Sequence, residues 1–129
     1  GALQNTIERL TNWTAPVRLR GRDWPLSVVP LARLNEVCIH HIDLDCTFSP
    51  DTVDPAAAAW LLRWVLDLLA DTDLPAMRLE GDSLVAELGN SGEARTVVGS
   101  DARLWAWLSG RMPASAVAGA DGLQPQLLA

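Results

Sequence analysis

Residues 77–98 read MRLEGDSLVAELGNSGEARTVV, and this stretch decides the class of fold. Apolar and polar side chains alternate over 77–80, 84–88 and 94–98, which is typical of strands that are buried on one face. Two Gly-containing turns separate the three segments. Strands that are joined by short turns usually pair with their neighbours in the chain, so the stretch predicts an antiparallel three-stranded meander.

Helical segments flank the predicted sheet on both sides. Residues 55–70 are almost entirely Ala, Leu, Val and Trp, and Asp54 is a suitable N-cap residue. Ser100 can cap a second helix over 100–109, which Gly110 would end. We therefore expect an α+β fold in which these two helices cover the sheet. Tryptophans at helical spacing are expected in its core: Trp60, Trp64, Trp105 and Trp107.

The beginning of the chain has a different pattern. A short helix is expected over 7–12, an extended loop or short strand over 14–26, and a longer helix from Ser27 to Leu44. Two such helices bury too little apolar surface to offset their ordering entropy. This part therefore docks on the sheet, pairs with a second copy in a homodimer, or belongs to a larger helical bundle. We expect two units, residues 1–48 and 49–129.

The composition excludes some classes of partner. The chain of 129 residues has 16 acidic side chains against 10 basic ones, and its net charge is −6. Negative charge repels the phosphate backbone, so we expect no nucleic-acid partner. No apolar run is long enough to span a bilayer, so we expect no membrane partner. Cys38 and Cys46 are interpreted as small apolar side chains in a reducing cytoplasm.

The helix expected at 27–44 carries a polar stripe with a candidate metal-binding pair. Glu36 and His40 are four residues apart, so in a helix they lie on one face, separated by about 6 Å of axial rise. A carboxylate and an imidazole at this spacing can bind one divalent metal, although a zinc site normally takes three or four protein ligands. The alternative interpretation is a solvated polar face.

Two motifs carry a resemblance to a known family. RxxExxxHxxDL, residues 33–44, resembles the last helix of the DinB-like metal-binding domain of mycothiol-dependent maleylpyruvate isomerases. VGSxxxLxxWLxGR, residues 98–111, is similar to the end of the sterol-carrier-like C-terminal domain of the same family. Each motif alone is weakly specific, but their order and separation together strengthen the resemblance.

The resemblance implies a site and its cofactors. In such enzymes two histidines and one glutamate hold a divalent metal, usually zinc, and mycothiol supplies a thiol. Glu36 and His40 match two of these ligands, but no histidine precedes His40 in this chain. Arg111 matches an arginine that faces the active site, although it is also placed to interact with the C-terminal end of its own helix.

Two functions are therefore carried forward. The chain resembles the C-terminal portion of a mycothiol-dependent metalloenzyme, with residues 1–48 as a remnant of a four-helix bundle. Such an enzyme would isomerise a small-molecule substrate from cis to trans, or transfer a thiol to it, through a metal-bound thiolate. We expect the intact protein to be an enzyme and this chain alone to be inactive. The alternative is a non-catalytic module whose sterol-carrier-like domain holds an apolar ligand or a partner.

Overall fold

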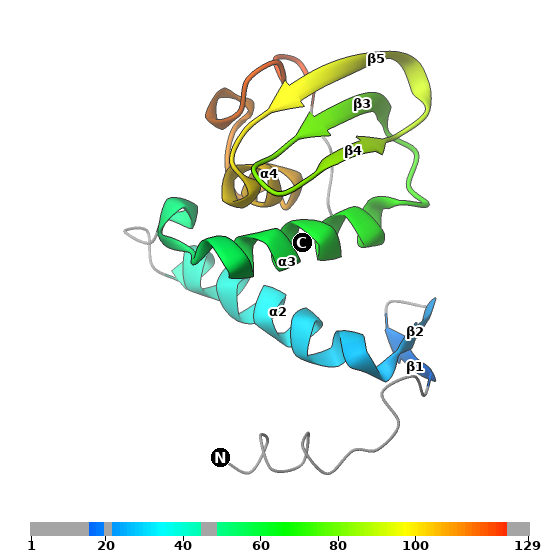
Figure 1. Ribbon diagram of the computed structural model, residues 1–129, viewed down its shortest axis with the longest axis vertical. Coiled ribbons are helices and arrows are strands. Elements are labelled where there is room, and N and C mark those ends of the chain that lie inside the picture. Colours follow the sequence, from blue (N-terminus) through cyan, green and yellow to red (C-terminus); the bar gives the residue numbers. More distant parts are fainter. Residues whose placement is uncertain (1–15, 20–21, 45–48, 124–129) are drawn as a thin grey trace.

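The structure, a computed structural model, describes residues 16–19, 22–44 and 49–123. A three-stranded sheet lies over helix α4, and helices α3 and α2 follow at increasing distance from the sheet (Figure 1). The expected helix over 7–12 lies outside the described residues. The main elements are β1 (Pro16–Leu19), β2 (Arg22–Pro25), α2 (Val29–Leu44), α3 (Pro55–Leu69), β3 (Pro75–Glu80), β4 (Val85–Leu88), β5 (Ser91–Val98) and α4 (Asp101–Leu108), with 3-10 turns at Leu26–Val28, Pro50–Thr52 and Ala114–Ala116.

The α+β class is confirmed, but the sheet is mixed and the predicted antiparallel meander is wrong. β3 is the central strand, with β4 antiparallel on one side and β5 parallel on the other. The chain therefore crosses from one side of β3 to the other between β4 and β5. The alternating pattern shows which face of a strand is buried but not which strand it pairs with, so it could not distinguish the two topologies.

Gly89 allows this crossing. It has φ of 76°, and a Cβ added there would lie 2.6 Å from the Leu74 carbonyl oxygen and collide with the carbonyl of Pro75. The backbone N–H groups of Asn90 and Ser91 both donate to the Leu74 carbonyl, at 3.2 and 3.3 Å. The turn thus passes directly across the start of β3, where no side chain fits.

Local capping begins both helices and ends α4, as predicted. The Asp54 carboxylate accepts hydrogen bonds from two backbone N–H groups in the first turn of α3, at 3.1 and 3.2 Å. The Ser100 hydroxyl accepts one from the Arg103 N–H at 3.1 Å, at the start of α4. Gly110 follows α4 with φ of 75°, a left-handed conformation that turns the chain back.

The core lies between the sheet and the helices α3 and α4. Seven of the eight residues of α4 are buried, so this helix has almost no solvent-facing side. Trp64, Trp105 and Trp107 are buried as expected. The prediction for Trp60 is wrong, because its side chain is 56% exposed and lies beside the guanidinium of Arg63, 5.5 Å from the ring centroid.

Helix α2 packs against the core with no completely buried residue. One hydrogen bond joins it to α4, from the indole N–H of Trp105 to the Asn35 side-chain oxygen, at 2.8 Å. The partly buried apolar side chains of α2 that pack on the core are Leu34, Cys38, Ile39 and Ile42. The division into units 1–48 and 49–129, and the bundle remnant within the first unit, stay predictions.

The segment expected as a loop or short strand forms the antiparallel pair β1–β2. The ring of Trp24 packs against Trp64 of α3, with centroids 5.1 Å apart. Arg22 lies over the Trp24 ring and donates to the Asp67 backbone carbonyl at 3.1 Å. These contacts attach the two strands to the C-terminal half of α3.

Gly89→Ala should destabilise the protein more than Gly92→Ala. Both glycines have positive φ, 76° and 82°, so both substitutions strain the backbone. That shared strain costs about 1–2 kcal/mol. Only Gly89 adds a clash with neighbouring carbonyl groups, so we expect a further loss of about 1–3 kcal/mol. Urea unfolding measures the difference in stability. Equal losses of stability would show that the turn at Gly89 does not lie in close contact with the start of β3.

Candidate functional site

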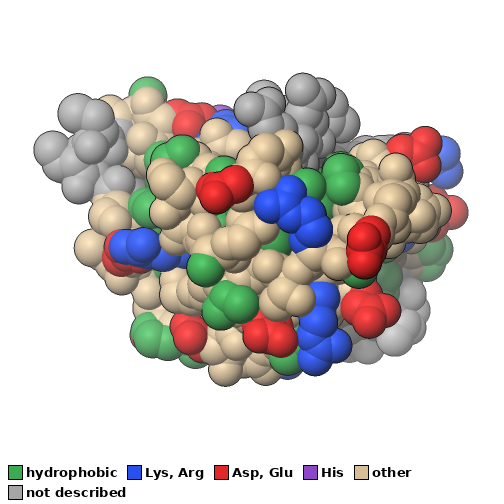
Figure 2. Space-filling model, turned by 90° about the horizontal axis from the view of Figure 1, so that it is seen from above, with side chains coloured by type: hydrophobic (Ala, Val, Ile, Leu, Met, Phe, Trp, Pro, Cys, Tyr) green, Lys and Arg blue, Asp and Glu red, His purple; other side chains and the backbone are tan. Residues whose placement is uncertain are grey.

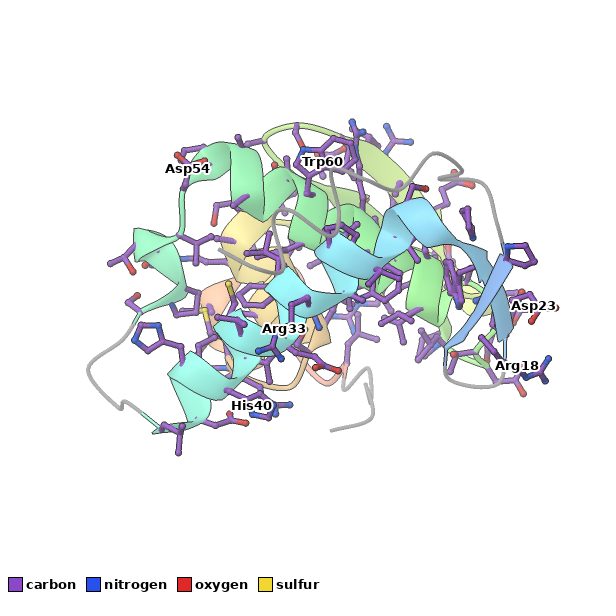
Figure 3. All side chains as sticks on the ribbon, turned by 90° about the horizontal axis from the view of Figure 1, so that it is seen from below. Arg18, Asp23, Arg33, His40, Asp54 and Trp60 are labelled. Carbon is purple, nitrogen blue, oxygen red and sulfur yellow. The ribbon has the colours of Figure 1, made fainter. Side chains whose placement is uncertain are left out.

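The polar stripe of α2 lies on the side of the helix that faces away from the sheet. Figure 3 views the molecule from this side and shows Arg33 and His40 along the helix. Glu36 and His40 are both exposed, and neither side chain has a hydrogen-bond or ion-pair partner among the described residues. The carboxylate and the imidazole are therefore available to bind a ligand.

Arg111 is held against the end of this stripe. Its Nε and one Nη nitrogen donate to the two carboxylate oxygens of Asp43, at 3.1 and 2.8 Å. Its other Nη nitrogen donates to the backbone carbonyl of Ser109, at 2.8 Å. The Arg111 side chain is only 17% exposed. It is thus fixed on two sides, by α2 and by the turn that ends α4.

The same contact sets the charge state of Asp43. The hydrogen bonds from Arg111 lower the pKa of the Asp43 carboxyl, against the opposing effect of desolvation. Electrostatic interactions with Arg111 and, to a smaller extent, with His40 lower the pKa further. His40 lies about one turn before Asp43 on α2, and its influence on Asp43 is electrostatic rather than a hydrogen bond.

The structure brings two of the predicted site regions together. Arg111 reaches the stripe that carries Glu36 and His40 by pairing with a residue 68 positions earlier in the chain. Arg111 is a predicted site residue, whereas Asp43 belongs to the predicted polar stripe and motif but is not among the predicted site residues. Its position, one turn after His40 on the same face of the helix, is the sequence feature that could have indicated a role for Asp43 in the site.

The described residues supply only part of a metal site. Glu36 and His40 fit a divalent metal in kind and spacing, but zinc normally takes three or four protein ligands. Among the described residues, no three or more His, Cys, Asp or Glu side chains cluster so as to hold a metal. Cys38 is half-buried against the core, and burial raises the pKa of its thiol, which disfavours the thiolate form. Cys46 lies outside the described residues.

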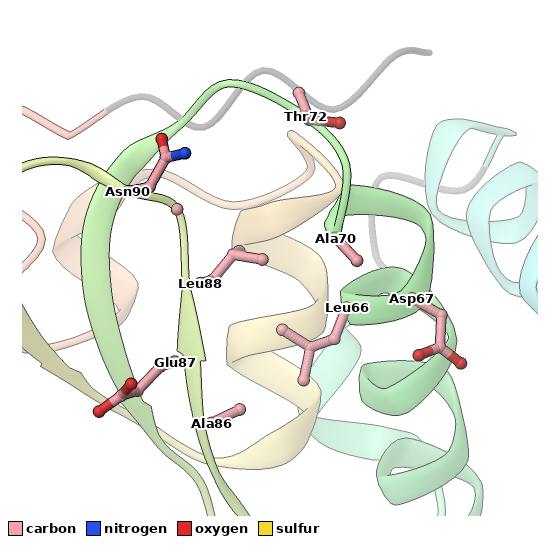
Figure 4. A pocket seen from close by; sticks show the side chains of 9 residues that line it. Leu66, Asp67, Ala70, Thr72, Ala86, Glu87, Leu88 and Asn90 are labelled. Atoms are coloured by element: carbon pink, nitrogen blue, oxygen red, sulfur yellow. The ribbon is translucent and has the colours of Figure 1, made fainter.

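An open hollow of about 400 Å³ lies between the end of α3 and the edge strand β4. Figure 4 shows Leu66 and Leu88 pointing into the gap from opposite walls, while Asp67 and Glu87 point away from it. Polar groups nevertheless make up more of the exposed lining than apolar ones. A hollow of this size falls within the range of small-molecule sites.

On the outer side of the sheet, the described residues form no patch of a single side-chain type. Figure 2 shows acidic and arginine side chains interspersed over this face, with apolar ones scattered between them. Arg78 and Glu80, for example, form an exposed ion pair at 3.2 Å. Among the helices of the described residues, none combines the length and apolarity needed to cross a bilayer.

Comparison with known proteins shows a shared fold. Two crystal structures of mycothiol-dependent maleylpyruvate isomerase, one of them a histidine-to-alanine mutant, match the chain with a TM-score of 0.72 and 21% sequence identity. The match covers 94% of this chain and 53% of the isomerase, so the chain spans about half the length of these neighbours. No protein-family model and no curated protein matches the sequence.

The Asp43–Arg111 contact should weaken in acid. Because the pKa of Asp43 is lowered in the folded state, the contact contributes stability above the unfolded-state pKa of about 4, and this is lost as pH falls through the folded-state pKa. Asp43→Asn should therefore lower the urea midpoint at about pH 7 and have little effect in acid, once the carboxyl is protonated in both the folded and the unfolded state. An equal effect at both pH values would contradict the ionic origin of the contact.

Zinc should bind only weakly to the 129-residue chain. Glu36 and His40 are two ligands where a stable site needs three or four. Elemental analysis after dialysis measures the metal content, with His40→Ala as the control. One tightly held zinc per chain would show that a further ligand comes from outside the described residues or from a second chain.

Proposed function

We propose that the chain is the C-terminal portion of a mycothiol-dependent metalloenzyme of the maleylpyruvate isomerase type. In this proposal Glu36 and His40 contribute ligands to a divalent metal, and Arg111 binds an anionic group of the substrate. The observation that carries the proposal is the contact of Arg111 with Asp43, at 2.8 and 3.1 Å. It joins the two sequence motifs, which lie far apart in the chain, at one end of α2.

The likeness of fold supports this assignment, since the matched neighbours are named as mycothiol-dependent maleylpyruvate isomerase. A bound divalent metal would lower the pKa of a coordinated thiol, here that of mycothiol, so that it is a thiolate at neutral pH. Glu36 and His40 would hold the metal from one helix, with the remaining ligands from residues outside the described ranges. The open outer side of α2 leaves both donors accessible for this role.

The substrate would be a small carboxylate-bearing molecule. The reaction would be a cis–trans isomerisation, or transfer of the thiol to the substrate. Arg111 suits such a substrate because its planar guanidinium binds a carboxylate through two parallel hydrogen bonds. Its position on the C-terminal side of α4, beside the polar stripe of α2, would hold the carboxylate close to the metal ligands.

A second candidate function rests on the hollow between α3 and β4. Leu66, Ala86 and Leu88 in its wall would contact an apolar ligand held by a non-catalytic, sterol-carrier-like module, whereas the polar part of the lining would not. The hollow is open rather than enclosed by the core, so only part of such a ligand would be covered. The contact between Arg111 and α2 has no role in this alternative, and we therefore favour the enzyme.

His40→Ala in the full-length protein should abolish metal binding and fumarylpyruvate formation together, because the thiolate needs the metal at neutral pH. Arg111→Lys should keep the metal but lose rate by about 10²-fold, since lysine cannot make a bidentate carboxylate contact. Metal content and turnover with mycothiol measure both effects.

Arg33→Lys is the matched control, because Arg33 is an exposed arginine on the same helix with no role in the proposal. It should keep both metal and rate. If the full-length wild type is inactive with saturating metal and mycothiol, the isomerase assignment is wrong. Retention of an apolar ligand by the purified protein would then favour the sterol-carrier-like alternative.

A further inference from the structure

The guanidinium of Arg111 is only partly used by its observed contacts. Asp43 and the Ser109 carbonyl take three of its N–H groups: the one on Nε and one on each Nη. An arginine side chain carries five such donors. One N–H on each Nη nitrogen therefore has no partner among the described residues. Two donors on neighbouring nitrogens match the two oxygens of a carboxylate.

Asp43 fixes the orientation of this remaining donor pair. Its carboxylate contacts the guanidinium through two parallel hydrogen bonds, which defines the plane of the group and its rotation within that plane. The Ser109 carbonyl restrains the opposite side. A free arginine would lose substantial rotamer entropy on binding a ligand, whereas Arg111 is already ordered in the folded chain.

We infer that Asp43 is the positioning residue for Arg111 and that it orients the two unused N–H groups toward a substrate carboxylate. This inference rests on the proposed function, because it assigns Asp43 a part in the substrate contact of the same site. Asp43 does not touch the substrate and acts only through Arg111. The expected consequence is weaker binding of carboxylate ligands when Asp43 is replaced, with the metal ligands Glu36 and His40 unaffected.

The chain contains a second arginine–aspartate pair of the same form. Arg103 donates from Nε and one Nη to the two carboxylate oxygens of Asp51, at 2.9 and 2.8 Å, and from its other Nη to the Ala116 backbone carbonyl at 3.3 Å. Asp51 and Asp43 have equally exposed side chains, at 43% each. The Arg103 pair joins the start of α4 to the turn Pro50–Thr52 and does not involve α2. Asp51→Asn is therefore a matched control for Asp43→Asn.

Kinetics of the full-length protein test the positioning role. Asp43→Asn should raise KM for the carboxylate substrate by about tenfold or more, the effect of losing about one charge-assisted hydrogen bond. Metal content should not change. Asp51→Asn should leave KM unchanged. Adding Asp43→Asn to Arg111→Lys should cost little further kcat/KM, because both substitutions remove the same contact.

If the contact between Asp43 and Arg111 has only a structural role, a different result is expected. Asp43→Asn would then lower the folded fraction while KM and the rate per folded molecule stayed at wild-type values. That outcome, or an equal rise of KM in Asp51→Asn, would overturn the inference. Asp43→Glu, which keeps the charge, should recover part of the lost affinity if the ion pair positions Arg111.

An NMR measurement separates this inference from the proposed function. In protein labelled with 15N-arginine, titration with fumarate as a carboxylate probe should shift the Arg111 Nε–H signal in wild type and in Asp51→Asn, and shift it much less in Asp43→Asn. This result with an inactive full-length wild type would support the positioning role and reject the isomerase. An active wild type whose Arg111 signal responds equally in all three proteins would keep the isomerase and reject the positioning role.

Discussion

The buried indole of Trp105 is the constraint on which the arrangement of the helices depends. Its side chain is fully buried at the centre of α4, and a buried N–H without an acceptor costs about 1–3 kcal/mol. Asn35 of α2 provides that acceptor at 2.8 Å. The contact requires one particular position of α2, whereas apolar contacts between half-buried side chains tolerate small shifts along the helix.

The geometry of the candidate site follows from this placement. Asp43 lies about two turns beyond Asn35 on α2, so the register that satisfies Trp105 also brings Asp43 to the end of α4. There the positive φ of Gly110 turns the chain, and the next residue, Arg111, meets the carboxylate. One part-buried hydrogen bond near the middle of both helices and one ion pair near the end of α2 thus join α2 to α4 and to the turn after it.

The two sides of α2 consequently have separate roles. The inner side holds the helix on the core, partly through polar contacts, and leaves Glu36 and His40 on the outer side without partners among the described residues. Unpaired polar side chains on an exposed helix are ordinary when they are scattered. Here His40 lies about one turn and Glu36 about two turns before Asp43, whose carboxylate pairs with Arg111, and His40 contributes to lowering the pKa of Asp43. The outer side of α2 is therefore a candidate binding site and not only a solvated surface.

The sequence by itself determined the features that depend on neighbouring residues. The caps at Asp54 and Ser100, the stop at Gly110 and the Glu36–His40 spacing are local, so helical geometry alone predicts them. Tertiary structure decided the rest. The parallel pairing of β5 with β3, the exposure of Trp60 and the partner of Arg111 each depend on residues far apart in the chain, and the periodicity of a single segment contains no information about them.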